Sequence, residues 1–300
     1  MNFTLMEEQL AGSPKQVIAL SGAAGDEIFQ AVRAIREKDL ADFILTGNEE
    51  VCISMCRRYE VKPLDILPAK TEPEEAALAV GAASSGAAQL IMKGQTSTPV
   101  LLKALLREKS LFDNDALLSH LAVLQNPEGR ILGITDGGMV PSPDLEQKVG
   151  ILKNAVRFFH KLGYASPRVA VLAANEKVSE KIPGSTDALA LKEMNGNGVI
   201  TGCLVDGPIS LDLALVPEAA RIKQYSGAVR GNADILLVHD VSAGNYLGKA
   251  LILFGGFTGG GLVTGARVPV ILLSRGDSAR EKYQSMILGL LGCSREGDNA

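Results

Sequence analysis

The sequence predicts an α/β fold built on mostly parallel sheets, and three features lead to this prediction. Short apolar runs alternate with amphipathic segments along most of the 300 residues. Several runs, such as DFILTG (42–47) and ADILLVHD (233–240), are continuously apolar, as strands covered on both faces should be. Helical patterns separate most of these runs, and strands joined through helices pair in parallel.

The composition is that of a globular protein with a large core. Hydrophobic residues make up 46% of the chain and charged residues 21%. A chain of this length usually divides into two domains. The net charge of −4 implies no broad basic face, so we expect no nucleic-acid partner.

Ten segments are candidate strands, and five are candidate helices. The strands are expected at 16–22, 42–47, 89–94, 120–125, 130–136, 168–174, 201–207, 233–240, 261–266 and 268–274. The helices are expected at 26–39, 48–60, 74–86, 144–163 and 187–198, and Gly163 is a C-cap signal.

One connection differs from the others and indicates a domain boundary. Asn126-Pro127-Glu128-Gly129 joins HLAVLQ (120–125) to RILGITD (130–136), which predicts an antiparallel hairpin. A hairpin inside a βα series often belongs to a second domain, so we expect a boundary near 112–118. Ten strands would also suffice for a TIM barrel, the competing fold. The hairpin, and the weak strand signal between 48–60 and 74–86, favour open sheets.

The cysteines and the N-terminus predict a reduced protein of the cytoplasm. No C-x-x-C pair occurs, and Cys52 and Cys56 lie four residues apart, on one face of a helix. MNFTLMEEQL carries acids and no long apolar run, so we expect no signal peptide. The apolar stretches are far shorter than the ~18 residues of a membrane span.

The turn after the strand at 89–94 has the outline of an anion site. In KGQTSTPV, Thr98 can cap a helix that has Pro99 at its first position. Free backbone N–H groups then lie beside the hydroxyls of Thr96, Ser97 and Thr98 and the amine of Lys93. Helix capping without any ligand explains the same residues about as well as an anion site does.

The segment VPVILLSRGDSARE (268–281) places an arginine directly after an apolar strand. Arg275 must reach water, a carboxylate or a bound anion, because an unpaired buried charge is costly. An ion pair and an anion site are both open. Ser278 and Glu281 have the spacing of a capping box. Asp206 and Asp240 end strands, where an aspartate can cap a helix, pair with an arginine or act as a base.

Together, these segments resemble the phosphate acetyl/butyryltransferase family. Four motifs that occur in the family's order carry the resemblance: MKGQTSTPVLLKALL (92–106), GSTDALALKEMNGNGVITGCLVDGPISLDLAL (184–215), ADILLVHDVSAGNYLGKAL (233–251) and GLVTGARVPVILLSRGDSA (261–279). The chain length and the SRGDSA form are more similar to the butyryl branch. P-loop, G-x-G-x-x-G and G-x-S-x-G motifs do not occur.

The resemblance implies transfer of a short acyl group between coenzyme A and inorganic phosphate, without a bound cofactor or metal. It implies two α/β domains, 1–115 plus 263–300 and 116–262, with an isocitrate/isopropylmalate dehydrogenase-like fold, an active site in the cleft between them, and a homodimer. The implied catalytic residues are Ser274, Arg275, Asp277 and Glu281. The implied substrate-binding residues are Lys93, Thr96, Ser97, Thr98, Asp206, Asp240, Gly244, Asn245 and Gly265.

Two positions depart from the acetyl branch. Glu281 stands where those enzymes have an aspartate that resembles a base for the thiol, so Asp277 and Glu281 both stay candidates. Lys103 stands where they have an arginine, and lysine lacks its bidentate fork. Besides butyryl transfer, three alternatives are open: transfer from acetyl-CoA, a nucleotide-dependent oxidoreductase of similar fold, and a non-catalytic acyl-CoA-binding module.

Overall fold

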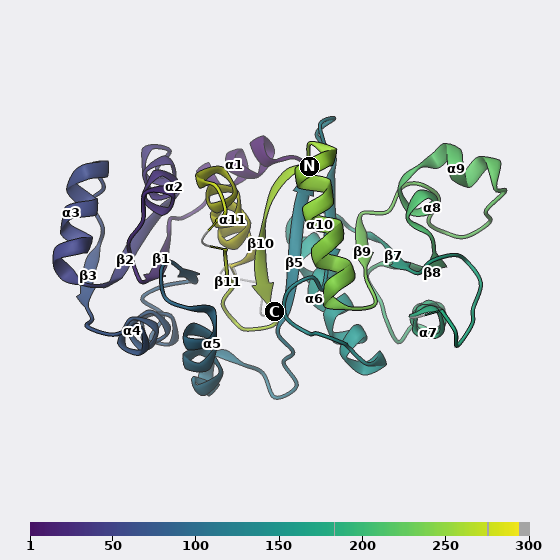
Figure 1. Ribbon diagram of the computed structural model, residues 1–300, viewed down its shortest axis with the longest axis horizontal. Coiled ribbons are helices and arrows are strands. Elements are labelled where there is room, and N and C mark those ends of the chain that lie inside the picture. The colour runs from purple at the N-terminus through teal and green to yellow at the C-terminus, as the bar shows by residue number, and fades with distance from the viewer. Residues whose placement is uncertain (183, 275, 294–300) are drawn as a thin grey trace. The chain divides into compact units, whose positions relative to one another are not determined.

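The computed structural model describes residues 1–182, 184–274 and 276–293, and the chain divides into two compact units. Unit 1 contains residues 1–2 and 117–258, and unit 2 contains residues 3–116 and 259–300. Each unit is an α/β assembly in which helices accompany β-strands (Figure 1). The fold prediction of α/β architecture is therefore confirmed.

Unit 2 contains six strands in the order β3-β2-β1-β4-β11-β10. All neighbours in this sheet are parallel except β10 and β11. Its elements are α1 (Phe3–Ala11), β1 (Gln16–Ser21), α2 (Asp26–Glu37), β2 (Ala41–Gly47), α3 (Glu49–Tyr59), β3 (Asp65–Pro68), α4 (Glu72–Ser84), β4 (Leu90–Lys93), α5 (Thr98–Arg107), a 3₁₀ turn (Lys109–Leu111), β10 (Thr258–Thr264), β11 (Val270–Ile271) and α11 (Ala279–Gly292).

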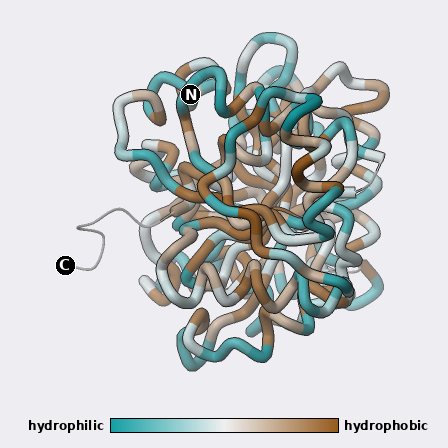
Figure 2. Tube along the Cα trace, turned by 90° about the vertical axis from the view of Figure 1, so that its left-hand side faces the viewer, coloured by the Kyte–Doolittle hydropathy of each residue, from teal (hydrophilic) through white to brown (hydrophobic). Residues whose placement is uncertain are grey.

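Helices cover both faces of the unit 2 sheet, which explains its continuously apolar strands. α4 and α5 lie on the face opposite α2, α3 and α11 (Figure 1). Phe29 on α2 and Phe43 on β2 are fully buried. Figure 2 shows hydrophobic strands in the interior and more hydrophilic helices outside them. Caps define the helix starts: Asn48 accepts a hydrogen bond from Val51 N at 3.0 Å at the start of α3.

Unit 1 contains five strands in the order β5-β6-β9-β7-β8. Its elements are β5 (Ser119–Gln125), β6 (Ile131–Thr135), α6 (Leu145–Lys161), β7 (Arg168–Leu172), α7 (Ser185–Gly196), β8 (Leu204–Ile209), α8 (Leu211–Leu215), α9 (Pro217–Ile222), β9 (Ile235–Leu237) and α10 (Val241–Gly255). β5 and β6 are antiparallel, and the other neighbours are parallel.

The predicted hairpin is confirmed. β5 pairs with β6 from Leu121 opposite Thr135 to Gln125 opposite Ile131. In the turn, Gly129 has a φ of 89°, a value that glycine tolerates, and its N–H donates to Asn126 O at 2.9 Å. Asn126 Oδ1 also accepts from Arg130 N at 2.7 Å. Antiparallel pairs and open strand orders contradict the competing TIM barrel.

The observed elements differ from the predicted ones in several places, and two of these differences have local causes. β3 was not among the candidate strands because only four residues form it, and their pattern is weak. β11 is two residues long although 268–274 is apolar, because strand pairing ends after Ile271. The sequence interpretation also named no helix at 3–11 or 241–255, where α1 and α10 lie.

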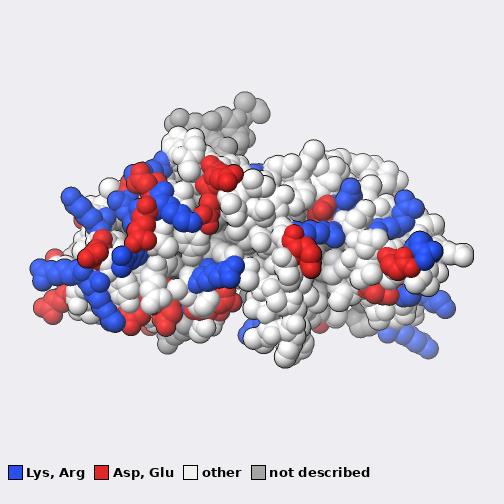
Figure 3. Space-filling view, turned by 90° about the horizontal axis from the view of Figure 1, so that it is seen from above, with Lys and Arg blue, Asp and Glu red and all other residues white. Residues whose placement is uncertain are grey.

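Charged side chains are interspersed over the helices of unit 2. Acidic and basic groups alternate over that part of the surface in Figure 3. Several form ion pairs, including Arg33 with Glu37 at 2.6 Å and Arg58 with Asp26 at 2.9 Å. Within the described ranges, no helix is both long enough and apolar enough to cross a membrane.

Candidate active site

The carboxyl ends of β1, β4 and β11 lie at one edge of the unit 2 sheet. β1 pairs with β4 in parallel, with Ser21 opposite Lys93, and β4 pairs with β11 in parallel, with Met92 opposite Ile271. The segments that follow these strands therefore emerge at the same edge. This placement gathers the Lys93–Thr98 turn and the turn that begins at Ser274 where parallel α/β sheets bind ligands.

Gly94 allows the first two of these segments to touch. Gly94 N donates to Ser21 O at 2.7 Å, and Gln95 N donates to Gly22 O at 2.8 Å. A Cβ atom at Gly94 would lie only 2.2 Å from Gly22 O. Any side chain there would push the Lys93–Thr98 turn away from the end of β1, so glycine is needed at position 94 for this close backbone contact.

Two carboxylates of α4 hold the threonine-rich turn. Thr96 is fully buried, its Oγ1 donates to Glu75 Oε2 at 2.8 Å, and the same Oγ1 lies 2.8 Å from Ser21 Oγ. Ser97 donates to Glu72 Oε2 twice, from its backbone N at 3.1 Å and from its Oγ at 2.6 Å. The turn is thereby fixed to both β1 and α4.

These bonds change the expected division of roles in the turn. A phosphate placed against Thr96 or Ser97 would meet the negative charges of Glu75 and Glu72, and in the structure these two residues anchor the turn. Thr98 is exposed in the first turn of α5 and has no hydrogen-bond partner among the described residues. Ser97, and not Thr98, occupies the N-cap position. Thr98 stays the hydroxyl that is open to a ligand.

Two buried lysines bring positive charge to this edge. Lys93 is 5% exposed, and its Nζ donates to Gly94 O at 3.1 Å. Lys282 on α11 is 3% exposed, and its Nζ donates to the Asp277 carbonyl. The third buried lysine, Lys148 of unit 1, instead pairs with the Asp187 carboxylate at 2.6 Å. The two amines at the strand ends favour an anion in this region.

The Ser274 turn is closed on itself. Ser274 N donates to Asp277 Oδ2 at 2.8 Å, and Asp277 N donates to Ser274 O at 3.2 Å. Ser274 Oγ accepts from Gly276 N at 3.3 Å, and the Ser274 side chain is exposed. The predicted catalytic Arg275 lies outside the described residues. Its two neighbours in the sequence are held in a defined turn.

Glu281 forms the predicted capping box. Its Oε2 accepts from Ser278 N at 2.8 Å and from Ser278 Oγ at 2.7 Å, while Ser278 Oγ accepts from Glu281 N at 3.3 Å. The carboxylate is therefore engaged at the start of α11. The other candidate base, Asp277, is engaged as well, because its Oδ2 accepts from Ser274 N at 2.8 Å.

Three cysteines, Cys52, Cys56 and Cys203, are poor nucleophiles. Burial raises the pKa of the Cys52 thiol and of the Cys203 thiol to about 11 each. Burial also raises the pKa of Cys56. The reactive thiolate form of these side chains is therefore scarce near neutral pH. This chemistry agrees with direct acyl transfer between substrates.

Asp206 is an internal residue of unit 1. Its side chain is 0% exposed and accepts hydrogen bonds from Lys192 Nζ at 2.8 Å, Gly207 N at 3.0 Å, Val229 N at 3.0 Å and Tyr225 Oη at 3.2 Å. Burial, followed by the charge of Asp206, raises the pKa of Tyr225. These contacts give Asp206 a structural role, which differs from the substrate contact expected from the sequence.

The other predicted substrate-binding residues of unit 1 lie on or beside α10. Asp240 caps this helix, accepting from Ala243 N at 2.8 Å, and lies 3.1 Å from His239 Nε2. Gly244 packs so closely that an added Cβ would lie 2.7 Å from Gly137 Cα. The exposed Asn245 approaches Gly137 O at 3.5 Å. Of these residues, Asn245 is the one best placed to meet a ligand.

Gly265, the last predicted substrate-binding residue, follows β10 in unit 2. Its φ of 102° is a backbone conformation that favours glycine. The structure thus explains why glycine is present in the connection to β11.

Three residues of the site could not be found by sequence reasoning. Glu72 lies 25 residues before Ser97 and Glu75 lies 21 residues before Thr96, the side chains that they hold. TEPEEA (71–76) has the pattern of an exposed helix start. Lys282 lies in a helix whose first turn is strongly charged, which predicts exposure. The one sequence signal for the two glutamates was the capping threonine Thr71. It fixes where α4 begins, and therefore where Glu72 and Glu75 lie on that helix.

Comparisons with known proteins agree with this arrangement. A family model described as "Phosphate acetyl/butaryl transferase" matches residues 69–290. A "Probable phosphate butyryltransferase" of Bacillus subtilis is 40% identical over 282 residues, covering 94% of each chain. A "Phosphate acetyltransferase" of Thermotoga maritima is 37% identical over 285 residues, covering 93% of this chain and 96% of the other.

A solved structure extends the comparison to the fold. The branched-chain phosphotransacylase from Enterococcus faecalis V583 matches with a TM-score of 0.82 and 31% identity, covering 93% of this chain and 100% of the other. Sequence and structure therefore agree over nearly the whole length of the protein. The chain belongs to the phosphate acetyl/butyryl transferase family.

Proposed function

We propose that this protein converts butyryl-CoA and inorganic phosphate into butyryl phosphate and coenzyme A. The observation that carries this proposal is the gathering of the Lys93–Thr98 turn and the Ser274 turn at one edge of the unit 2 sheet. The named relative from B. subtilis supports butyryl as the acyl group. The relative from T. maritima makes acetyl-CoA the second candidate.

The reaction joins two anions at one carbonyl carbon. A phosphate oxygen attacks the thioester carbonyl, and the C–S bond then breaks. The proton that the hydrogen phosphate loses passes to the leaving thiolate, which becomes the free thiol of coenzyme A. Arg275 and Lys93 are the proposed cations that lower the repulsion and stabilise negative charge on the tetrahedral intermediate. Ser274 Oγ hydrogen-bonds the reacting centre. Such direct transfer needs positioning, charge stabilisation and a proton carrier.

Asp277 is the proposed proton carrier for the thiol. Its carboxylate lies in the same turn as Ser274, 2.8 Å from Ser274 N. The competing carboxylate of Glu281 is engaged by both donors of Ser278. Glu281 then contributes by fixing the start of α11, and with it the end of the catalytic turn.

Free-thiol release from acetyl-CoA, butyryl-CoA and isobutyryl-CoA, each with and without phosphate, tests the function. We expect release that depends on phosphate and is fastest with butyryl-CoA. Fastest release from acetyl-CoA would contradict the butyryl preference and support the second candidate. Release that ignores phosphate would contradict phosphate as acceptor.

We also propose a homodimer, and the exposed face of α10 supports it. Tyr246, Leu253 and Phe254 are 72%, 70% and 88% exposed, and their spacing places them on one side of the helix. Lys249 is the single charged residue in α10. Against the same face of a second copy, these side chains would leave water, which stabilises by roughly 25 cal/mol per Å² of apolar surface. A two-fold interface needs such a self-complementary patch.

Charge placed in this face should separate the subunits. For Leu253→Asp/Phe254→Asp, we expect light scattering after size exclusion to give the chain mass of 31.6 kDa, and twice that mass for the parent. Ile222→Asp is the matched control, because Ile222 on α9 is 67% exposed. Dissociation by the control variant as well, or a monomeric parent, would contradict α10 as the interface.

We further propose that the two compact units are the two predicted domains, 1–115 plus 263–300 and 116–262. The unit boundaries at 116/117 and 258/259 support this. Four properties stay predictions: the site in an interdomain cleft, the likeness to isocitrate and isopropylmalate dehydrogenases, the cytoplasmic location and the lack of a bound cofactor.

A further inference from the structure

Lys282 is a buried cation near the start of α11, a place where two physical effects disfavour lysine. Its side chain is 3% exposed, and removing an ammonium group from water is costly. It is also the fourth residue of the helix, close to the positive end of the helix dipole, which repels a cation. Residues that break such rules are expected mainly at functional sites.

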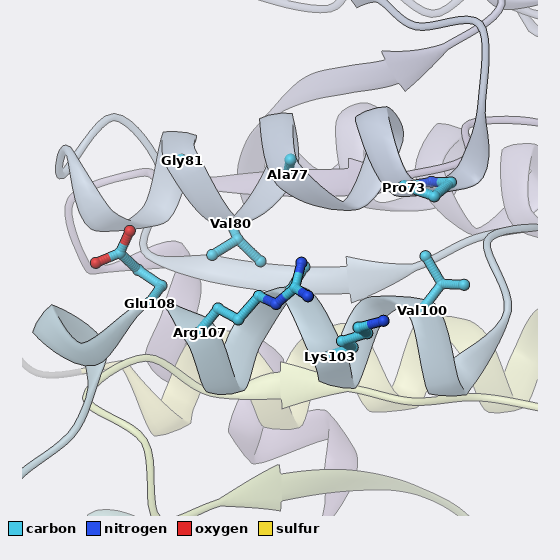
Figure 4. A pocket seen from close by; sticks show the side chains of 9 residues that line it. Pro73, Ala77, Val80, Gly81, Val100, Lys103, Arg107 and Glu108 are labelled. Atoms are coloured by element: carbon cyan, nitrogen blue, oxygen red, sulfur yellow. The ribbon is translucent and has the colours of Figure 1, made fainter.

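Three other cations show what usually compensates such a charge. Lys103 and Arg107 of α5 are exposed beside a groove between α4 and α5, so water solvates them (Figure 4). Lys148 on α6 is buried, and the Asp187 carboxylate pairs with it at 2.6 Å. Lys282 has neither form of compensation: it is buried, and within the described part of the chain no carboxylate forms an ion pair with it.

Lys282 instead binds the turn that begins at Ser274. Its Nζ donates a hydrogen bond to the Asp277 carbonyl, and Asp277 Oδ2 accepts from Ser274 N at 2.8 Å. The side chain thus reaches back past Ser278, the N-cap residue, to the residue that closes the turn. Ser274 and Asp277 are the proposed groups that contact the reacting centre and carry the proton. The placement of both depends on the Asp277 backbone that Lys282 holds.

α11 gives Lys282 a fixed base on the unit 2 sheet. Ser285 lies three residues further along the helix, and its Oγ accepts a hydrogen bond from Gly261 N of β10 at 3.0 Å. A Cβ atom at Gly260 would lie 2.6 Å from Ser285 N, so the helix and the strand are in close contact here. A hydrogen bond from this part of the helix to the turn therefore ties the turn to the sheet.

We propose that Lys282 is a positioning residue for the acyl transfer. Its ammonium group holds the Asp277 carbonyl and thereby fixes Ser274 and Asp277 relative to the unit 2 sheet. Fixed geometry at the reacting centre lowers the barrier of the chemical step, while the buried charge lowers the stability of the fold. The assignment rests on the proposed function, because Lys282 acts on the reaction through the Ser274 turn.

Lys282→Met separates the two consequences, because methionine is similar in length and has neither charge nor donor. We expect kcat with butyryl-CoA to fall about tenfold or more, since the reacting groups lose their fixed geometry. KM for butyryl-CoA should change less than about twofold, because the turn acts in the chemical step. The temperature of thermal unfolding should stay the same or rise, because an apolar side chain replaces a buried charge that no carboxylate pairs with.

Lys148→Met is the matched control. It also replaces a buried lysine by methionine, but it lies in unit 1 and leaves the Asp187 carboxylate without its partner. We expect a lower unfolding temperature and parental kcat. Parental kcat in Lys282→Met would overturn the assignment. An unfolding temperature that falls as far in Lys282→Met as in the control would give Lys282 a structural role and would overturn it as well.

Hydrogen–deuterium exchange keeps this test separate from the test of the reaction. The Ser274 and Asp277 amides both donate within the turn, so a peptide that covers residues 274–281 reports whether the turn is held. We expect exchange in this peptide to be roughly tenfold faster in Lys282→Met and parental in Lys148→Met.

Unchanged exchange in Lys282→Met would overturn the proposal even if kcat falls, because the lysine would then act without the turn. If the parent turns over no thioester, the proposed function fails. Faster exchange in Lys282→Met would in that case still support Lys282 as the residue that holds the turn.

Discussion

Replacement of Asp206 by alanine is expected to lower the free energy of unfolding by about 3–5 kcal/mol, because it removes the common acceptor of a buried network. The backbone N–H groups of Gly207 and Val229 and the hydroxyl of Tyr225 all donate to this carboxylate. Burial keeps water from replacing it, since Val229 and Asp206 are both 0% exposed. Chemical denaturation measures the loss directly.

Asp212→Ala is the control for this prediction. Asp212 is an exposed carboxylate of unit 1 that pairs with Lys223 at 2.9 Å, and such surface pairs contribute about 1 kcal/mol or less. Its removal should barely change the unfolding curve. A stable Asp206→Ala protein that has lost turnover would contradict the structural role and return Asp206 to the substrate-binding residues.

Replacement of Arg275 by alanine is expected to reduce turnover about 100-fold or more while the protein stays folded. The guanidinium is the proposed group that offsets repulsion between phosphate and the developing oxyanion. Its sequence neighbours Ser274 and Gly276 belong to a turn closed by Asp277. Steady-state rates with butyryl-CoA, beside thermal unfolding, measure both parts of the prediction.

Arg280→Ala provides the matched control, because Arg280 is exposed on the first turn of α11, five residues further along the chain. The same charge is lost, and we expect near-parental rates. Near-normal turnover in a folded Arg275→Ala protein would show that charge stabilisation comes from elsewhere, with Lys93 and Lys282 as the remaining cations at this edge.

Periodic patterns allowed much of the fold to be predicted. The apolar runs at 16–22 and 42–47 became neighbouring parallel strands, and the Asn-Pro-Glu-Gly turn became a hairpin, because both features depend on local chemistry. Capping signals were equally local, and the Ser278–Glu281 box formed as expected.

The division of labour within the site could not be predicted, because it depends on contacts between distant segments. The hydroxyls of Thr96 and Ser97 resembled anion ligands in the sequence, and only the fold brings Glu75 and Glu72 against them. Asp206 likewise resembled other strand-end carboxylates until its four donors were known. Lys282 lies in the charged first turn of α11, yet its side chain is 3% exposed, a burial that depends on contacts with other segments.

Detection of the acyl phosphate itself tests the central claim most directly. Butyryl-CoA and inorganic phosphate are mixed with the protein, and the phosphorus NMR spectrum is followed beside the release of thiol. We predict one butyryl phosphate for each coenzyme A released, because the phosphate oxygen forms the bond that replaces the thioester. Release of coenzyme A with butyrate as the sole acyl product would contradict the account, since water and not phosphate would then be the acceptor.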